Sequence, residues 1–248
     1  MKFLETKVSI PDRGFLTSNR RIMDIVADQG WENFAKQLES SVPAVVYEFY
    51  ANAYFPQDVI EKWVPISRTI INQYYGLQDI EEDGYQRYLD NVDPDEVKSS
   101  ICAFNTAWKI ERNGILVKFS TRGLDKYGKA WHQFVCAKLM PVWHVSRITK
   151  DRAILLFAIL TNKSIDVGRV IYHQITQSVR NPKLGLYFLS LITDLCKHAE
   201  VTWEGHEIWE GPHHPINDGV IASYKEGDDD AEHEPPRPHR PVSTMSVP

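Results

Sequence analysis

Residues 148–162, ITKDRAILLFAILTN, decide the fold, because they predict a helix that is apolar on nearly every side. Thr149 is a suitable N-cap residue, and Asp151 falls in the first turn, where its charge interacts favourably with the helix dipole. A helix that is apolar all round needs neighbours on all sides. The sequence therefore predicts that this segment is the central helix of the protein.

Helical patterns also flank this segment. Residues 129–140, KAWHQFVCAKLM, carry one apolar stripe that ends before Pro141, formed by Trp131, Phe134, Val135 and Leu139. Residues 164–179 have apolar side chains at helical spacing, namely Val167, Val170, Ile171, Ile175 and Val179, and Asn181-Pro182 closes them. Residues 186–199, LYFLSLITDLCKHA, predict one more mainly apolar helix. Four consecutive helices with short links predict an orthogonal or bundle-like α domain.

The first half of the chain predicts shorter helices. They fall in residues 18–31, with Ser18 or Asn19 as cap and Gly30 as stop, in the largely buried segment 42–55, in 64–77, and within 78–100, where Asp93 or Pro94 opens a helix. In residues 107–119, AWKIERNGILVKF, Asn113-Gly114 predicts a small β-hairpin, with an irregular loop as the alternative.

Composition places the protein in the globular class, with 248 residues, 43% hydrophobic and 25% charged. We assign residues 1–224 to a single mainly α-helical domain. Residues 225–248 are acidic and then Pro-rich, and we expect this tail to be disordered. PPRPHRP, residues 235–241, has the composition of an SH3-like ligand, although we do not favour that partner.

The sequence also bears on localisation. The longest apolar run, Ala153 to Leu160, is far below the roughly 18 residues that span a bilayer, so no membrane association is expected. The N-terminus, MKFLETKVSIPDRGF, has no apolar core of a secretory signal. Cys102, Cys136 and Cys196 form no CxxC pair and are interpreted as reduced thiols. We therefore expect an intracellular protein, cytoplasmic or nuclear.

Charge is unevenly distributed along the chain, whose net charge is −5. Gln57 to Arg112 holds six basic and eleven acidic residues, whereas Lys129 to Glu200 holds ten basic and four acidic ones. The basic region could attract a polyanion or the acidic half of another copy, and ordinary solvated helix faces are the alternative. Its candidate phosphate contacts are Arg147, Lys150, Arg152, Arg169 and Arg180.

Patterns of catalysis and metal binding are incomplete in this sequence. It has neither GxGxxG nor GxxxxGK[ST], and His206–Glu210 lacks the second histidine of a zinc protease helix. A looser set of ligand types, Cys196, His198, His206, His213 and His214, is better explained as a surface cluster. His132 and Cys136 lie four residues apart and could form a dyad, but we favour positions at the edge of a core helix. We therefore predict no catalytic residue, no metal site and no cofactor.

Four blocks in order carry a family resemblance. They are WENFAKQ with VVYEFYANA, then KAWHQFVCAKLMPVWHVS, then TKDRAILLFAILTNKSIDVGRVI, then LYFLSLITDLCKHAEV. Together, over roughly residues 15–203, they resemble the plant-specific domain called putative plant transposon protein, often found beside retroelement sequence. The segment after EFYAN is shorter here than in that family. The resemblance implies an origin in a mobile element and supplies no catalytic residues.

Three functions follow as hypotheses. The first is a non-enzymatic structural or assembly module, comparable in role to a retroelement capsid protein, that associates with itself. The second is weak, salt-sensitive binding of RNA or DNA through the basic region Lys129–Glu200. The third, suggested only by the family's name, is a transposase-type nuclease.

Overall fold

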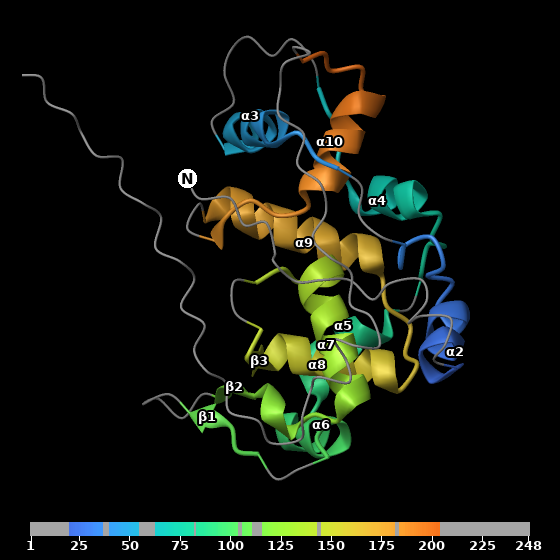
Figure 1. The fold of residues 1–248 in the computed structure, drawn as a ribbon, viewed down its shortest axis with the longest axis vertical. Coiled ribbons are helices and arrows are strands. Elements are labelled where there is room, and N and C mark those ends of the chain that lie inside the picture. Colours follow the sequence, from blue (N-terminus) through green and yellow to red (C-terminus); the bar gives the residue numbers. More distant parts are fainter. Residues whose placement is uncertain are drawn as a thin grey trace, which may run out of the picture.

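The computed structural model describes residues 20–36, 40–54, 63–81, 83–103, 106–110, 116–142, 145–181 and 184–203. This part of the chain is mainly α-helical, with one small sheet (Figure 1). The helices are α2 (Arg20–Asp28), α3 (Pro43–Tyr54), α4 (Arg68–Tyr75), α5 (Gly84–Asn91), α6 (Pro94–Ile101), α7 (Lys126–Phe134), α8 (Lys150–Leu160), α9 (Val167–Arg180) and α10 (Leu189–His198). Two short helical segments are η1 (Thr121–Gly123) and η2 (Val135–Leu139), and the strands are β1 (Lys109–Ile110), β2 (Leu116–Ser120) and β3 (Arg147–Thr149).

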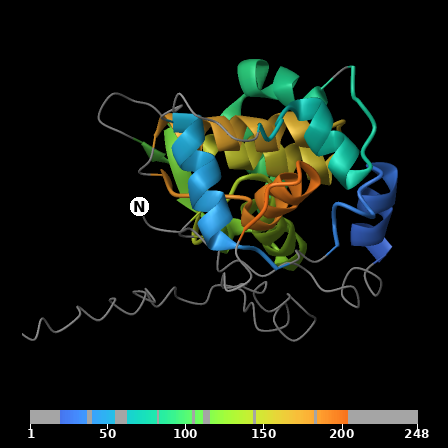
Figure 2. The same ribbon diagram turned by 90° about the horizontal axis from the view of Figure 1, so that it is seen from above.

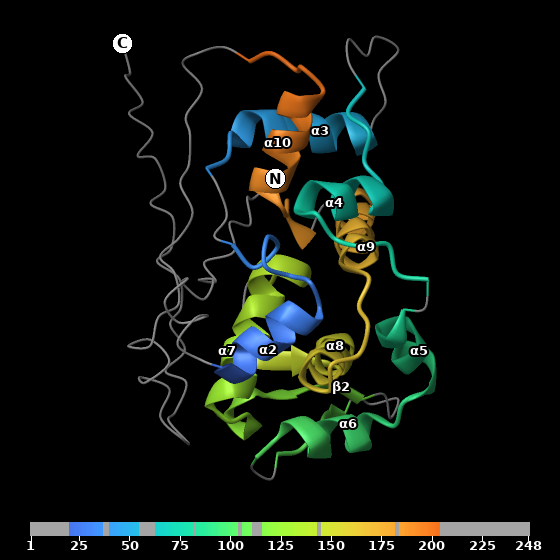
Figure 3. The same ribbon diagram turned by 90° about the vertical axis from the view of Figure 1, so that its right-hand side faces the viewer.

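Helix α8 is the centre of one half of the molecule. Residues 153–159 are all buried, and α5, α6, α7, β2 and β3 pack around the helix (Figures 1 and 3). The predicted central helix is therefore confirmed. Thr149 occupies the predicted N-cap position, but its side chain makes no capping hydrogen bond there.

Helix α9 organises the other half. It packs against α3 and α4, and α10 lies beside α3, as the view from above shows (Figure 2). The segment η2 contacts both α8 and α9, and one continuous hydrophobic cluster includes side chains from both halves. The two halves therefore share a core.

The predicted helix over residues 129–140 differs in detail. It begins earlier, at Lys126, because Asp125 accepts a hydrogen bond from the Gly128 amide (2.7 Å). After Phe134 the chain widens into the π-helical segment η2, in which the Met140 amide bonds to the Val135 carbonyl at 2.7 Å. The predicted stripe is buried, and so are Ala130, His132 and Cys136 beside it, whereas Lys129 and Gln133 are half-buried.

The sheet has three antiparallel strands in the order β1-β2-β3. Pairing of β1 with β2 confirms that the predicted hairpin segments lie side by side, while Asn113-Gly114 falls outside the described residues. Strand β3 pairs Ile148 with Phe119 and both side chains are buried. The sequence does not predict β3, because three residues are too few to show alternation.

The shorter helices follow their predicted signals. Gly30 and Gly76 adopt positive φ angles of 65° and 67° after α2 and α4, and Asp93 caps α6. Ser18 and Asn19 lie outside the described residues. Helix α3 is less buried than expected, since Val45, Val46 and Tyr50 are buried but its remaining described side chains are half-buried or exposed.

The last predicted helix is shorter than expected. Phe188 has a φ of 58°, so α10 begins only at Leu189. The predicted domain boundary at residue 224 and the tail, 225–248, lie outside the described residues. None of the described helices has the length and apolar character needed to cross a bilayer.

Gly168 offers a direct test of the contact between α4 and α9. A Cβ at this position would lie 2.3 Å from the Arg68 carbonyl oxygen and 2.6 Å from Asn72 Oδ1. Gly→Ala inside a helix usually stabilises by up to about 1 kcal/mol. We expect Gly168→Ala instead to lower the free energy of unfolding by about 2 kcal/mol, as overpacking does, in urea denaturation.

Gly30→Ala is the control for backbone strain alone, because nothing lies within 4 Å of its Cβ position although φ is 65°. This substitution should lower the free energy of unfolding by on the order of 1 kcal/mol. A Gly168→Ala variant as stable as the native protein would contradict the close approach of the two helices.

Candidate functional site

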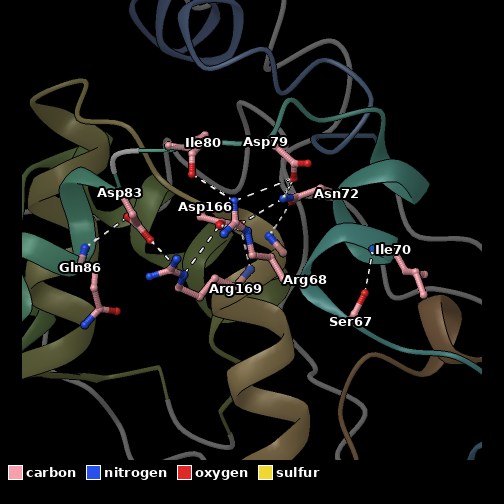
Figure 4. Close-up of polar contacts among 11 residues, drawn as sticks. Ser67, Arg68, Ile70, Asn72, Asp79, Ile80, Asp83, Gln86, Asp166 and Arg169 are labelled. Carbon is pink, nitrogen blue, oxygen red and sulfur yellow. Dashed lines mark hydrogen bonds and ion pairs between the residues drawn. The ribbon is translucent and has the colours of Figure 1, made fainter.

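A cluster of charged side chains lies where α4, α5 and the start of α9 meet (Figure 4). Its centre is Asp166, whose side chain is fully buried and caps α9 by accepting a hydrogen bond from the Arg169 amide at 3.0 Å. Arg68 Nε lies 2.5 Å from Asp166 Oδ2. The buried carboxylate is therefore paired with a cation, as its desolvation requires.

Asn72 completes this arrangement from the middle of α4. Its Nδ2 donates to Asp166 Oδ1 at 3.2 Å, and its Oδ1 accepts the Gly168 amide at 2.8 Å. Arg68 also donates to the Ile80 carbonyl at 3.1 Å. The sequence does not predict the grouping of Asp166, Arg68 and Asn72, and only Asp166 has a local signal, as an N-cap residue before Val167.

Arg169 links the cluster to α5. Its Nε lies 3.8 Å from Asp166 Oδ2 and 3.9 Å from Asp83 Oδ2, so it forms long ion pairs with both carboxylates. Burial raises the pKa of Asp83 above its usual range, and this effect exceeds the opposing effects of nearby N–H groups and of Arg169. The cluster therefore joins α4, α5 and α9, and its Asp83 carboxylate is only partly stabilised by its neighbours.

The predicted phosphate contacts are not on one face. Arg147 in β3 and Lys150 at the start of α8 lie close in the chain, and Arg152 follows on α8 with its guanidinium bonded to the Met140 carbonyl (3.3 Å) and Thr149 Oγ1 (3.3 Å). Arg169 belongs to the charged cluster, and Arg180 lies about 16 Å further along α9. Nucleic-acid binding by these five residues stays a prediction.

The sheet brings together a different basic group. Lys109 pairs with Lys118 and Lys118 with Thr149, so these positions share one face, and Arg147 lies on it two residues before Thr149. The opposite face carries the buried Phe119 and Ile148. We call Lys109, Lys118 and Arg147 the basic sheet face; the sequence analysis missed its two lysines.

His132 and Cys136 do contact each other, with His132 Nε2 3.4 Å from Cys136 Sγ. Both are buried in the core, more deeply than the predicted position at its edge. Burial lowers the pKa of His132 to about 3 and raises the pKa of Cys136 to about 12. Both groups are therefore neutral at physiological pH, and the sulfur lacks the thiolate character of a nucleophile.

The looser set of metal ligands is only partly described. Cys196 is buried in α10, whereas His198 is exposed and its Nδ1 lies 2.8 Å from the Asp194 carbonyl oxygen. His206, His213 and His214 lie outside the described residues. Across the described ranges, no three His, Cys, Asp or Glu side chains are grouped as metal ligands.

Lys138 is a buried lysine in η2. Its Nζ donates to the Lys36 carbonyl at 2.7 Å and lies 5.5 Å from the centre of the Phe34 ring and 6.0 Å from that of Tyr75. Burial lowers the pKa of Lys138 to about 7. The π-electron faces and the carbonyl offset part of the cost of burying this amine.

An apolar groove of about 220 Å³ lies between α3 and α9. Its walls are Phe49, Ala53, Ile66, Tyr172, Ile175, Thr176, Val179 and Arg180. Tyr172 is 38% exposed at this groove, and Trp63, three residues before Ile66, is 77% exposed. Exposed aromatic side chains beside an apolar groove are typical of surfaces that contact another molecule.

Comparison with known proteins confirms the family resemblance. The family model described as putative plant retrotransposon-related domain matches residues 27–202 of the chain. No curated protein and no solved structure matches this chain.

Lys138 generates a pH-dependent prediction. A free lysine titrates near 10.5, so between pH 10.5 and 7 unfolding takes up a proton that the folded chain does not hold. Lys138 should therefore contribute a rise of about 4 kcal/mol to the free energy of unfolding from pH 7 to pH 10, while the cysteine thiols, whose pKa values burial raises, contribute in the opposite direction. Lys138→Met should be more stable than the native protein at pH 7 and should lack this rise, in urea denaturation series at each pH.

Lys36→Met is the matched control, because Lys36 is exposed and its backbone carbonyl, the partner of Lys138, is retained. Its free energy of unfolding should change with pH as that of the native protein does. A Lys138→Met variant whose free energy of unfolding changes with pH as that of the native protein does would show that Lys138 is charged in the fold.

Proposed function

The chain belongs to the putative plant retrotransposon-related domain family, and we propose that it is a non-enzymatic structural module that associates with further copies of itself. The observation that carries this proposal is the apolar groove between α3 and α9 with Tyr172 exposed beside it. Burial of such side chains on association would remove apolar area from water and favour a contact.

Charge supports a second copy as the occupant of this surface. Arg180, an exposed cation at the end of α9, lies in the groove wall. The region around α5 and α6 is acidic, and Asp93, Asp95 and Glu96 are exposed there. Two copies can therefore bring surfaces of opposite charge together, as in a capsid-like assembly.

The buried chemistry supports a non-enzymatic role. His132 and Cys136, the pair with the clearest catalytic pattern, are neutral and enclosed in the core. A transposase-type nuclease has no observation in its favour beyond the family's name, and we do not propose it.

Light scattering of the full chain over a concentration series tests self-association. We expect the mass to grow with concentration, and more strongly at low than at moderate salt. Tyr172→Ser should weaken association about tenfold, since an aromatic side chain at an interface contributes on the order of 1–2 kcal/mol.

Ile110→Ser is the control, because Ile110 is 58% exposed on β1, away from the groove. It should associate like the native protein. A constant monomer at high concentration and low salt would refute the proposal, and equal effects of both variants would remove the groove from it.

A second candidate function is weak nucleic-acid binding, and the basic sheet face favours it. Lys109 and Lys118 stand directly opposite each other, an arrangement that costs free energy in an isolated sheet and is relieved by an anion. Together with Arg147 they offer closely spaced cations to a phosphate backbone.

The salt dependence of binding tests this candidate. Titration of the full chain with a fluorescent single-stranded RNA should give weak binding that falls steeply with salt. Lys118→Gln and Arg147→Gln should each lower the slope of log K against log salt by about one. Lys197→Gln, on the exposed end of α10, should not. Absent or salt-insensitive binding would eliminate the candidate.

A further inference from the structure

A cavity of about 330 Å³ lies between α5 and α9, beside the charged cluster. Its polar walls include Asp83, Asp151, Arg169 and His173, and its apolar walls include Leu89 and Val170. The volume falls in the range of small-molecule sites in proteins, which combine apolar walls with a few placed polar groups. The cavity is separate from the apolar groove and from the basic sheet face.

Asp83 is the polar group that most needs a partner in this cavity. Its side chain is 4% exposed, and Oδ1 caps α5 by accepting the Gln86 amide at 3.2 Å. Oδ2 has no hydrogen bond to any residue that the structure describes, and Arg169 Nε, at 3.9 Å, is beyond hydrogen-bond distance. A buried carboxylate oxygen without a hydrogen bond is destabilising, and a donor that entered the cavity would relieve it.

Arg169 does not supply that donor, because it is shared. Its Nε lies almost equally far from Asp166 and from Asp83, at 3.8 and 3.9 Å. The second carboxylate in the wall, Asp151, adds another negative charge. The cavity therefore carries more negative than positive charge.

Tyr85 also lies in the wall. Burial is the largest cause that raises its pKa, the charges of Asp151 and Asp83 raise it further, and Arg152 acts in the opposite direction. The two carboxylates therefore contribute a negative potential at this wall.

We propose that this cavity binds a small organic cation, a primary ammonium group on a short alkyl body. The ammonium donates a hydrogen bond to Asp83 Oδ2, and Asp151 contributes to its attraction. The alkyl body packs against Leu89 and Val170. An ammonium group has three N–H donors, and the two carboxylates in the cavity wall can accept them.

Nuclear magnetic resonance titration of the full chain with n-pentylammonium tests the site, with n-pentanol as the uncharged probe of the same length and pentanoate as the anionic one. Pentylammonium should shift the amide signals of Gln86, Leu89 and Gln174 and saturate in the millimolar range, as expected for so small a ligand. Pentanol and pentanoate should bind at least about tenfold more weakly, because neither carries a positive charge that can pair with the Asp83 carboxylate.

Asp83→Asn removes the charge but keeps an oxygen that can cap α5, since asparagine is as good an N-cap residue as aspartate. It should weaken pentylammonium binding at least about tenfold. Asp93→Asn is the matched control, because Asp93 caps α6 in the same way, with a hydrogen bond from the Asp95 amide at 2.9 Å, outside the cavity. It should bind like the native protein.

Leu89→Trp is the second variant, which fills the cavity without a change of charge and should abolish the same shifts. Three outcomes would overturn the proposal: no saturable shift with pentylammonium, equal binding of pentanol, or full binding by a folded Asp83→Asn variant. The unchanged amide spectrum outside the cavity verifies that each variant is folded.

Discussion

The ion pair between Asp166 and Arg68 is the interaction on which the arrangement of the helices depends. A fully buried carboxylate is tolerated only with a close cation and further hydrogen bonds, and here Arg68 at 2.5 Å, the Asn72 amide and the Arg169 backbone N–H supply them. Removal of Arg68 would leave the buried Asp166 carboxylate with only the long ion pair to Arg169. The pair therefore fixes where the first turn of α4 meets the first turn of α9.

This constraint reaches beyond two helices because of its place in the chain. Asp166 lies in the connection between α8 and α9, and each of these helices organises one half of the molecule. Gly168 lets the α4 backbone approach closely enough for Asn72 to bond both Asp166 and the Gly168 amide. Hydrophobic burial would permit several relative positions of α4 and α9, whereas these directional bonds permit one.

Local signals in the sequence predicted the helices well, because periodicity, caps and glycines act within a few residues. Gly30, the predicted stop of the first helix, follows α2 with a φ of 65°, and residues 153–159 are buried on all sides as their pattern predicts. The sequence could not predict the pairing of Asp166 with Arg68, which lie far apart in the chain. The same limit applies to the basic sheet face, since the alignment of Lys118 with Thr149 depends on the strand register.

Burial strongly shifts the pKa values of His132, Cys136 and Lys138, which lie in α7 and η2, inside the core. At His132 and Cys136 desolvation favours the neutral forms, which removes imidazolium and thiolate chemistry from the place where the sequence pattern most resembles a catalytic site. Exposed basic side chains, such as Arg147 and Arg180, lie at the surface on separate elements. Exposed charges of this kind are suited to binding other molecules, and this is why the surface features, rather than the helical segment that carries His132 and Cys136, support the functional proposals.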